Sequence, residues 1–537
     1  MLAAIHSAAV IGIEAYDVTV EVDAAQGLPQ WTIVGLPAGA VKESRERVGA
    51  ALVNSGFVVP PKRFTINLAP ADRRKDGTAF DLPIALGILV ATGQLRAESV
   101  AHIVAVGELG LDGTLRAMRG ALPISRRVAQ RITRSATPTL VLPPANVGEA
   151  SLVRATVLAA PESLRELVGA LRRNLLARAV PTACATACAG DPLDFADVVG
   201  QGTAKRALEI AAAGGHNVVM VGPPGAGKTM LARRLPSILP ALTESEALDV
   251  TAIHSVAGVL APGDPRVVAR PFRAPHHTIS DAGLIGGGNP PRPGEVSLAH
   301  HGILFLDELL EFRRHVVESL RQPMEDGRVV IARAALAIAF PARFTLVGAM
   351  NPCPCGNAGD GAHACICAAA DITKYRARLS GPMRDRVDMH VPVGAVALST
   401  LAAAGEGERS ASIRERVELA RARQLERYAG SGEIAVNAHV SARLLQSLGA
   451  LTAEARSLLT SAAERLGLTA RGYHRVLRVA RTIADLDASW GVESPHVAEA
   501  LRYRTTGENA SSPRATLSLE RHPAATGEKS DDNENSG

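Results

Sequence analysis

The amino-acid sequence predicts two consecutive α/β domains followed by a helical region. Strand-like and helix-like runs alternate over residues 1–170 and again over residues 195–394, whereas residues 395–505 have the apolar period of helices. With 537 residues, 47% of them hydrophobic, the chain can bury a sizeable core, which excludes wholesale disorder.

The first domain is predicted from short apolar runs with alternating polarity, separated by longer helix-like runs. The strand-like runs are residues 18–23, 63–69, 102–109 and 139–143, and the helix-like runs are residues 38–56 and 80–93. The alternation of apolar and polar residues from Ala15 onward predicts a strand. We expect no leader peptide, because residues 1–23 lack a basic segment and a small-residue cleavage site.

Two segments lack any sustained period. Residues 171–194 are rich in Ala, Cys and Pro and are predicted to be a linker, in which Cys184 and Cys188 are ordinary thiols. Residues 506–537 are polar and aperiodic, so we expect a disordered tail.

Composition narrows the class of protein. The longest apolar run, residues 82–93, is shorter than the roughly 20 residues that cross a bilayer, so we expect a cytoplasmic protein without a membrane partner. Lys and Arg number 58 against 53 Asp and Glu, a net charge of +5 that neither requires nor excludes nucleic acid. Only 3% of residues are aromatic, which argues against an extended base-stacking platform.

The strongest motif is a phosphate-binding loop that fits G-x4-G-K-[ST] at every defined position. It follows the apolar run 217–221 and precedes a helix-like run, which is the context that the motif requires. Backbone N–H groups of such a loop bind phosphate, the lysine reaches the β- and γ-phosphates, and the hydroxyl binds Mg²⁺, so ATP and Mg²⁺ are the expected cofactors. The loop residues are Gly222, Pro223, Pro224, Gly225, Ala226, Gly227, Lys228 and Thr229.

A second motif places Asp307 and Glu308 directly after the apolar run 303–306. Carboxylates at the carboxyl end of a buried parallel strand lie where such sheets bind ligands. Asp307 is predicted to hold Mg²⁺ and Glu308 to polarise the attacking water. A strand that ends in a solvated acidic turn is the alternative, and the loop at Gly222 makes it the weaker one.

Two further candidates follow downstream. Asn351 ends the apolar run 344–350 and can orient water beside a γ-phosphate, although Asn is also a common turn former. Arg384 and Arg386 lie in a turn-like segment, where an arginine can stabilise transition-state charge in a neighbouring subunit. A surface salt-bridge cluster is an equally good interpretation of these arginines from the residues alone.

The ordered motifs GPPGAGKT, ILFLDE, GAMNP and SGPMRDRVD resemble those of AAA+ ATPases. More narrowly, residues 272–309 are similar to the magnesium-chelatase-like ComM/YifB family, and the resemblance covers residues 1–505. It implies a P-loop AAA+ module with a helical C-terminal lid. It also implies an ATP-promoted homohexamer with ATP between subunits, acting on single-stranded or branched DNA in recombination or natural transformation.

The resemblance also assigns roles by position. Asn351 corresponds to sensor 1, and Arg386 to an arginine finger acting in trans, although Arg384 stands where a hydrophobic residue is more usual. Arg471 best fits sensor 2, with Arg475 as the second choice. Lys228 and Thr229 correspond to Walker A, Asp307 and Glu308 to Walker B.

Two segments resemble pore-facing insertions of related rings. Residues 272–294 are similar to the helix-2 insert and residues 328–343 to the pre-sensor-1 hairpin. Arg328 and Arg333 could therefore follow a phosphate backbone. The alternative interpretation is that Arg328 and Arg333 are ordinary solvated charges.

The first domain resembles the proteolytic domain of Lon, which has a ribosomal-S5-like fold. Residues 75–81, KDGTAFD, put Ala79 at the position of the nucleophilic serine, and Leu122 takes that of the general-base lysine. A Ser–Lys pair needs a hydroxyl and an amine within hydrogen-bond reach, so we predict no peptidase activity. A substrate-binding or ring-organising role remains, including a protein partner for this domain.

Four cysteines fall in one short stretch as two C-x-C pairs. Two such pairs can supply four soft ligands to a tetrahedral structural Zn²⁺, with His363 as a substitute ligand, whereas reduced thiols are the alternative. The pairs His276/His277 and His300/His301 lack ligand spacing and are expected to be structural or pore-loop residues. The cluster is Cys353, Cys355, Cys365 and Cys367.

The sequence thus favours a Mg²⁺-dependent hexameric ATPase that drives DNA translocation or branch migration. One alternative is a protein-remodelling ATPase akin to the magnesium-chelatase motor subunit. Another is a nucleotide-gated scaffold, which the complete set of Lys228, Asp307 and Glu308 disfavours.

Overall fold

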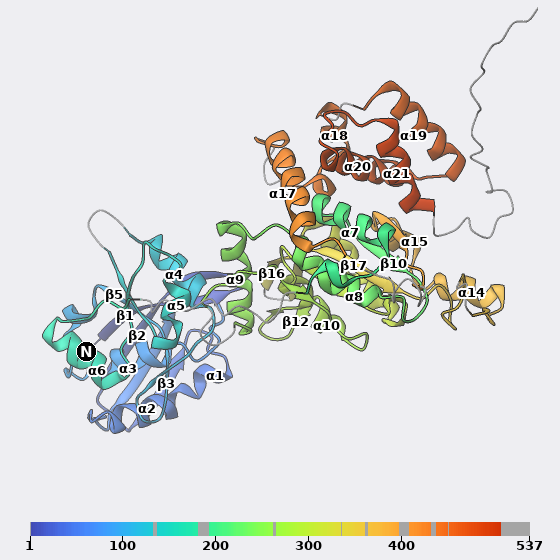
Figure 1. Ribbon diagram of the computed structural model, residues 1–537. Helices are drawn as coiled ribbons and strands as arrows, with labels where there is room; N and C mark the ends of the chain where they lie inside the picture. The colour runs from blue at the N-terminus through green and yellow to red at the C-terminus, as the bar shows by residue number, and fades with distance from the viewer. Residues whose placement is uncertain are drawn as a thin grey trace, which may run out of the picture.

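A computed structural model describes residues 2–132, 137–180, 193–260, 265–333, 336–359, 363–396, 407–430, 436–448 and 451–505. Half of the expected linker, including the thiols Cys184 and Cys188, and the expected tail lie outside these ranges. Figure 1 shows an N-terminal α/β region, a second α/β region beside it, and C-terminal helices beyond the second region.

The N-terminal region contains a mixed sheet with the order β3-β4-β2-β1-β5-β8-β9. β1 and β2 form a long antiparallel hairpin, and β5, β8 and β9 continue the sheet in parallel. The short strands β6 (Glu108–Leu109) and β7 (Leu115–Arg116) pair separately. The sheet strands are β1 (Leu2–Ile11), β2 (Glu14–Ala25), β3 (Gln30–Val34), β4 (Arg63–Ala69), β5 (Ile103–Ala105), β8 (Thr139–Val141) and β9 (Val157–Ala159).

Helix α3 is the centre of this region, because every one of its residues is buried. It packs on β1 and β2, and Gly87 permits the close approach, since a Cβ there would lie 2.5 Å from Val22 Cγ2. The helices are α1 (Gly39–Lys42), α2 (Ser44–Asn54), α3 (Asp81–Ala91), α4 (Ala121–Ala129), α5 (Val147–Ala150) and α6 (Leu164–Arg173), with 3₁₀ turns η1 (Ala97–Val100) and η2 (Pro144–Asn146).

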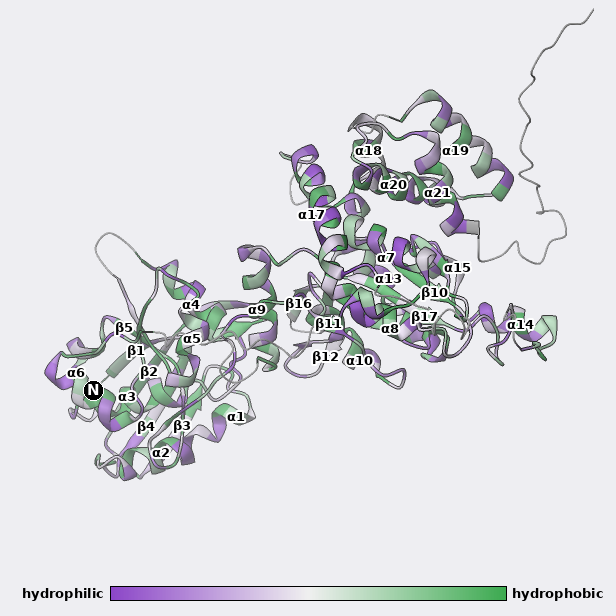
Figure 2. Cartoon of the chain, in the orientation of Figure 1, coloured by the Kyte–Doolittle hydropathy of each residue, from purple (hydrophilic) through white to green (hydrophobic). Residues whose placement is uncertain are grey.

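The second region contains a sheet of five parallel strands in the order β11-β14-β17-β10-β18. Its central strands are apolar and buried, and Figure 2 shows the strands of both sheets mostly in the hydrophobic colour. The carboxyl ends of all five strands therefore meet at one edge. The strands are β10 (Val218–Val221), β11 (Phe272–Arg273), β14 (Ile303–Leu306), β17 (Thr345–Met350) and β18 (Met389–Pro392).

Helices and two small hairpins surround this sheet. The hairpins are β12 (Gly286–Gly287) with β13 (Arg292–Pro293), and β15 (Arg328–Arg333) with β16 (Leu336–Pro341). The helices are α7 (Gly202–Gly214), α8 (Lys228–Arg234), α9 (Glu244–Ala257), α10 (Asp281–Leu284), α11 (Glu295–Leu298), α12 (Arg314–Ser319), α13 (Arg321–Asp326), α14 (Ala369–Arg376) and α15 (Gly381–Arg384), with 3₁₀ turns η3 (Phe195–Asp197), η4 (Leu235–Ile238) and η5 (Leu309–Glu311).

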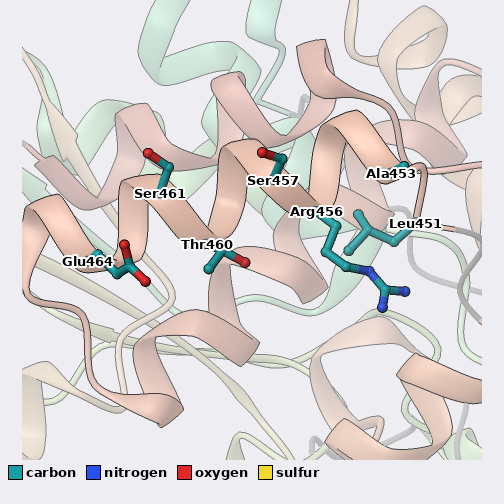
Figure 3. Close-up of a pocket in the computed structure, with 7 residues that line it drawn as sticks. All are labelled: Leu451, Ala453, Arg456, Ser457, Thr460, Ser461 and Glu464. Carbon is teal, nitrogen blue, oxygen red and sulfur yellow. The ribbon is translucent and has the colours of Figure 1, made fainter.

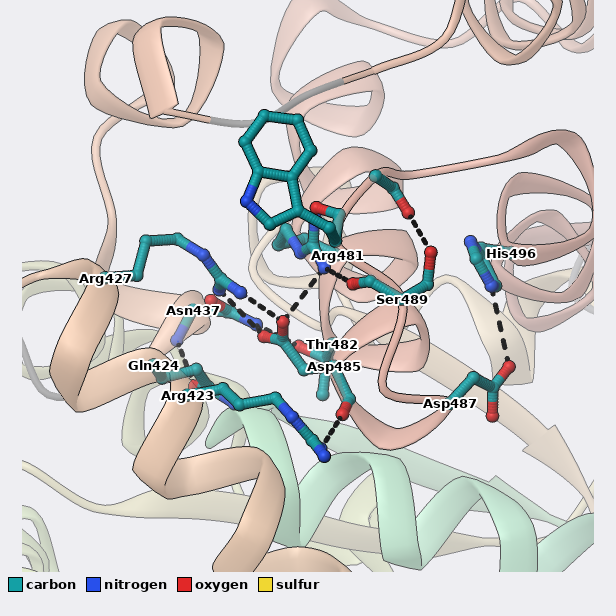
Figure 4. Close-up of polar contacts among 12 residues, drawn as sticks. Arg423, Gln424, Arg427, Asn437, Arg481, Thr482, Asp485, Asp487, Ser489 and His496 are labelled. Carbon is teal, nitrogen blue, oxygen red and sulfur yellow. Dashed lines mark hydrogen bonds and ion pairs between the residues drawn. The ribbon is translucent and has the colours of Figure 1, made fainter.

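The C-terminal helices share a hydrophobic core with the second sheet, because α17 and α20 both pack on α7. A buried polar network stabilises them: Asp485 accepts hydrogen bonds from Arg427 and Arg481, and Arg481 is only 1% exposed (Figure 4). The helices are α17 (Ser410–Arg427), α18 (Ala442–Leu448), α19 (Ala453–Leu466), α20 (Ala470–Leu486) and α21 (Ser494–Thr505), with the 3₁₀ turn η6 (Asn437–His439). Among the described helices, none is long and apolar enough to cross a bilayer.

Helix α9 joins the N-terminal region to the second sheet (Figure 1). It contacts α4, where Arg126 forms an ion pair with Asp249 over 3.2 Å. Ser255 on α9 donates a hydrogen bond to the buried Glu149, which also accepts one from the backbone N–H of Leu122. The two regions are therefore held together by buried polar contacts.

Candidate nucleotide-binding site

The loop between β10 and α8 has a backbone that requires glycine. Gly225 and Gly227 have left-handed φ angles of +76° and +87°. At Gly222, a Cβ would lie only 1.9 Å from the carbonyl oxygen of Val393, so no side chain fits. The loop can thus present its N–H groups to phosphate, with the N-terminus of α8 behind them.

Lys228 lies at the first position of α8, and its ammonium group turns back over the loop. Its Nζ donates to the carbonyl oxygens of Gly222 and Pro223 over 2.7 and 2.8 Å. Burial lowers the pKa of Lys228, whereas the nearby carboxylates of Asp307 and Glu308 act in the opposite direction. The lysine is therefore a half-buried cation at the carboxyl edge of the sheet.

Thr229 and Asp307 are brought together from neighbouring elements. Thr229 Oγ1 donates to Asp307 Oδ2 over 2.8 Å, and Asp307 follows the buried strand β14. A hydroxyl and a carboxylate in contact are oxygen ligands of the kind that Mg²⁺ prefers. These two residues fit a magnesium ion bound to the nucleotide.

Glu308 has a strained backbone and an exposed side chain. Its φ is +51°, which is uncommon for a residue with a Cβ, and such outliers cluster at functional sites. His277 Nδ1 lies 3.7 Å from Glu308 Oε2. This neighbour was not foreseen in the sequence, where His277 lacked ligand spacing, because the contact joins residues that no local pattern relates.

Asn351 also reaches the phosphate-binding loop. Its Oδ1 lies 3.3 Å from Lys228 Nζ, at the end of β17 beside β10. Gln201, which the sequence analysis missed, donates to the carbonyl oxygens of Ala226 and Gly394 over 3.0 and 2.6 Å. Gln201 thereby ties the loop to the segment after β18, and no motif in the sequence identifies it.

The candidate arginines lie together, but at the amino ends of the strands, opposite the phosphate-binding loop. A cavity of about 450 Å³ is lined by Arg471 and Arg475 together with Asn217, which immediately precedes β10. Arg475 donates to the carbonyl oxygen of Arg386 over 3.1 Å. The amino ends of the strands therefore gather these arginines, whereas Lys228 lies past the carboxyl end of β10 in the same chain.

Arg386 is only 7% exposed and fully engaged in local contacts. It forms an ion pair with Glu325 over 2.7 Å and donates to the carbonyl oxygens of Arg321 and Pro382. Arg475 pairs with the buried Asp388. Burial acts to raise the pKa of Asp388, but Arg475 and His216 hold it well below its ordinary value.

The four cysteine sulfurs form one cluster, all within 4.8 Å of one another. Cys353 Sγ lies 3.4 Å from Cys355 Sγ and 3.6 Å from Cys365 Sγ, and the last two are 3.6 Å apart. Backbone N–H groups of Asn357 and Ile366 lower the pKa of Cys355 to about 6. His363 is exposed and is not part of the cluster.

The residues at the expected peptidase positions have apolar side chains. Leu122 is fully buried at the start of α4, and Ala79 precedes α3, whose first residue, Asp81, accepts hydrogen bonds from Ser44 and Arg47. Burial raises the pKa of Asp81 despite these partners. Absence of peptidase activity stays a prediction, based on the missing hydroxyl and amine.

A hollow along α19 is lined by none of the residues described above (Figure 3). It has a volume of about 650 Å³, and polar side chains of one helix, including Arg456, Ser457 and Glu464, line it together with Leu451. It offers no cluster of groups with a common ligand chemistry.

The site combines a phosphate-binding loop after β10, two carboxylates after β14 and a polar residue after β17. This combination defines an AAA+ type of ATPase site. Three family models match the chain: "Magnesium chelatase, subunit ChlI" over residues 194–401, "Magnesium chelatase, subunit ChlI C-terminal" over residues 407–504, and "Subunit ChlI of Mg-chelatase" over residues 20–146. The chain is thus a magnesium-chelatase-like AAA+ protein. This family supports ATPase activity and implies ATP and Mg²⁺ as cofactors.

Similar proteins identify the family more closely. Competence protein ComM of Haemophilus influenzae is 44% identical over 509 residues, covering 94% of this chain and 97% of the relative. The uncharacterized protein YifB of Escherichia coli is 40% identical over 509 residues with the same coverage. The chain belongs to the ComM/YifB family. Lon protease 2 of Bacillus subtilis is 29% identical over 184 residues, 30% of this chain and 33% of that protein.

Proposed function

We propose that this protein is a hexameric motor that couples Mg²⁺-dependent ATP hydrolysis to movement along single-stranded or branched DNA in the cytoplasm, as in branch migration. The observation that carries the ATPase part is the convergence of Lys228, Thr229, Asp307 and Glu308 at one edge of a parallel sheet. Ligands of such sheets bind at this edge.

Each of these residues has a defined chemical task in the proposal. Lys228 leaves the loop carbonyls and binds the β- and γ-phosphates, and Thr229 with Asp307 holds Mg²⁺. Glu308 polarises the attacking water, and Asn351 orients it. His277 contacts Glu308 and would position that carboxylate.

The position of the arginines supports a ring. Arg386, Arg471 and Arg475 lie at the amino ends of the strands, across the sheet from Lys228 of the same chain. If neighbouring subunits place these two edges together, the exposed Arg471 contacts the nucleotide of the next subunit, and Arg386 does so once it leaves its ion pair with Glu325. An arginine supplied in trans stabilises the charge of the transition state.

The proposed boundaries are residues 1–170 for a Lon-like domain, 195–394 for the ATPase core and 395–505 for the helical lid.

The hairpin β15–β16 supports DNA as the substrate, because Arg328 is exposed on it; the side chain of Arg333 lies outside the described residues. The same hairpin contacts the N-terminal region, since Gly12 lies against Ile338. The name of the relative ComM, a competence protein, agrees with a DNA substrate.

A protein-remodelling ATPase is the second candidate. The three matching family models are all named after the magnesium-chelatase subunit ChlI, which favours it. In this alternative the N-terminal region binds a protein partner.

The proposal includes a structural Zn²⁺ at the four cysteines. A tetrahedral site with Zn–S bonds of about 2.3 Å places sulfur atoms about 3.8 Å apart. The Sγ–Sγ distances of 3.4–3.6 Å are close to this value. Backbone N–H groups of Cys355 and Ala358 point at the Sγ atoms of Cys367 and Cys353, which supports thiolates there.

The test is steady-state ATPase activity of the purified protein alone and with single-stranded, duplex and forked DNA. We expect forked DNA to stimulate hydrolysis most. The variant Arg328→Ala with Arg333→Ala should bind DNA more weakly, with a shallower salt dependence and unchanged basal activity. Arg456→Ala, an exposed arginine on α19, is the matched control. A rate that no DNA changes would favour protein remodelling instead.

A further inference from the structure

The cysteine cluster directly adjoins the phosphate-binding loop. Gly356, which directly follows the first C-x-C pair, has a left-handed φ of +87°, and a Cβ there would lie 2.6 Å from Pro224 Cδ. The backbone of the cysteine loop is thus packed against a residue of the nucleotide loop with no room for a side chain between them.

The cluster is also connected to the other nucleotide-site elements. Cys353 stands two residues after Asn351, whose side chain contacts Lys228. On the far side, Arg376 of α14 donates to the carbonyl oxygen of Pro352 over 3.1 Å. Arg378 then donates to the carbonyl oxygen of Leu310, in the turn that follows Glu308. The cysteine loop and α14 therefore bridge the segments after β17 and β14.

Little apolar burial stabilises this bridge. Among the described residues from 352 to 368, only Pro352, Cys353 and Gly356 are buried, and Ile366 is 87% exposed. A segment with so small a core depends on cross-links for its shape, as small metal-bound modules do.

We propose that Zn²⁺ bound by the four cysteines is a clamp on the phosphate-binding loop, so that metal occupancy sets the affinity for nucleotide. This inference rests on the proposed zinc site. Loss of the metal frees the contact between Gly356 and Pro224 and the connection through Asn351. The loop must then be ordered when nucleotide binds, which weakens binding.

The test measures zinc content and nucleotide binding separately on the full chain. Protein as purified, protein stripped with a zinc-selective chelator under reducing conditions, and stripped protein reloaded with Zn²⁺ are each titrated with a fluorescent ATP analogue and Mg²⁺. We expect about one zinc per chain, a loss of affinity of about tenfold or more on stripping, and recovery on reloading. Hydrolysis and DNA are not part of the readout, so failure of the motor proposal is separable.

Two variants keep the test decisive if stripping unfolds the protein. Gly356→Ala retains all four thiols and should retain zinc while binding nucleotide more weakly. Cys355→Ser with Cys367→Ser should lose both, whereas the control Cys184→Ser with Cys188→Ser should lose neither. Equal nucleotide affinity in zinc-loaded and zinc-free protein, or in Gly356→Ala and the unmodified chain, overturns the clamp and leaves the zinc site standing. Protein with no zinc overturns both.

Discussion

Thr229 Oγ1 donates a hydrogen bond to Asp307 Oδ2 over 2.8 Å, and this contact joins the first turn of α8 to the carboxyl end of β14. The two residues are 78 positions apart in the chain, so the fold of the parallel sheet alone brings them together. Their contact marks the place where a Mg²⁺ ion would bind. The ion would replace this hydrogen bond and take both oxygen atoms as ligands.

Removing the Asp307 carboxylate should therefore weaken the binding of Mg²⁺ and slow hydrolysis. For Asp307→Asn we expect a fall in the ATPase rate of about 100-fold or more, because an amide supplies no negative charge to the ion. The measurement is the rate of hydrolysis as a function of Mg²⁺ concentration. An unchanged Mg²⁺ dependence in this variant would show that Asp307 does not hold the metal.

Mixing two inactive variants tests whether each site is shared by two subunits. Lys228→Ala loses the phosphate contact, and Arg471→Ala, on the exposed side of α20, loses the contribution in trans. When the two are mixed, about one interface in four combines an intact Lys228 with an intact Arg471, so activity should return. A mixture no more active than its components would rule out a contribution of Arg471 in trans.

Glu149 should make the contact between the N-terminal region and α9 sensitive to pH. Burial raises the pKa of Glu149 above its ordinary value, and hydrogen bonds from Ser255 and Leu122 counteract this only in part. The folded protein therefore binds the proton more tightly than the unfolded chain, and the stability from this group is lost as pH rises through the folded pKa. Urea unfolding at about pH 5 and about pH 8 should show a smaller change in the free energy of unfolding for Glu149→Gln than for the unmodified protein.

Asp388 should behave in the opposite direction. Its pKa is held low in the folded state by Arg475, so its contribution is present above the ordinary pKa of aspartate and lost as pH falls through the folded pKa. Asp388→Asn leaves the Arg475 charge without its partner and should lower the free energy of unfolding at neutral pH by about 3 kcal/mol. Asp487→Asn, which removes a partly exposed ion pair with Arg206, is the control and should cost less than about 1 kcal/mol. Equal effects of the two substitutions would rule out a special role for the buried pair.

Local patterns explain what the sequence could predict. The run at residues 63–69 is β4, residues 80–93 contain α3, and the phosphate-binding loop has the backbone that its glycines indicate. In contrast, β1 was not predicted, because residues 2–11 have small apolar side chains without clear alternation. Its pairing with β2 and β5 is what makes it a strand.

The arrangement of the candidate site could be predicted only in part. Loop, carboxylates and Asn351 come together because each follows a strand of one parallel sheet. The edge at which Arg471 lies depends on how α17 and α20 pack on α7, which no single segment encodes. The contacts of His277 with Glu308 and of Gln201 with Ala226 likewise join residues without a shared motif.

In the proposed mechanism, Glu308 activates water for hydrolysis of Mg-ATP bound at Lys228. The most direct test measures nucleotide affinity and ATPase rate together for the unmodified protein and for Glu308→Gln. We expect both proteins to bind Mg-ATP with similar affinity. The variant should hydrolyse it more slowly by a factor of about 100 or more. A variant that binds nucleotide and hydrolyses it at the unmodified rate would show that Glu308 does not activate the water.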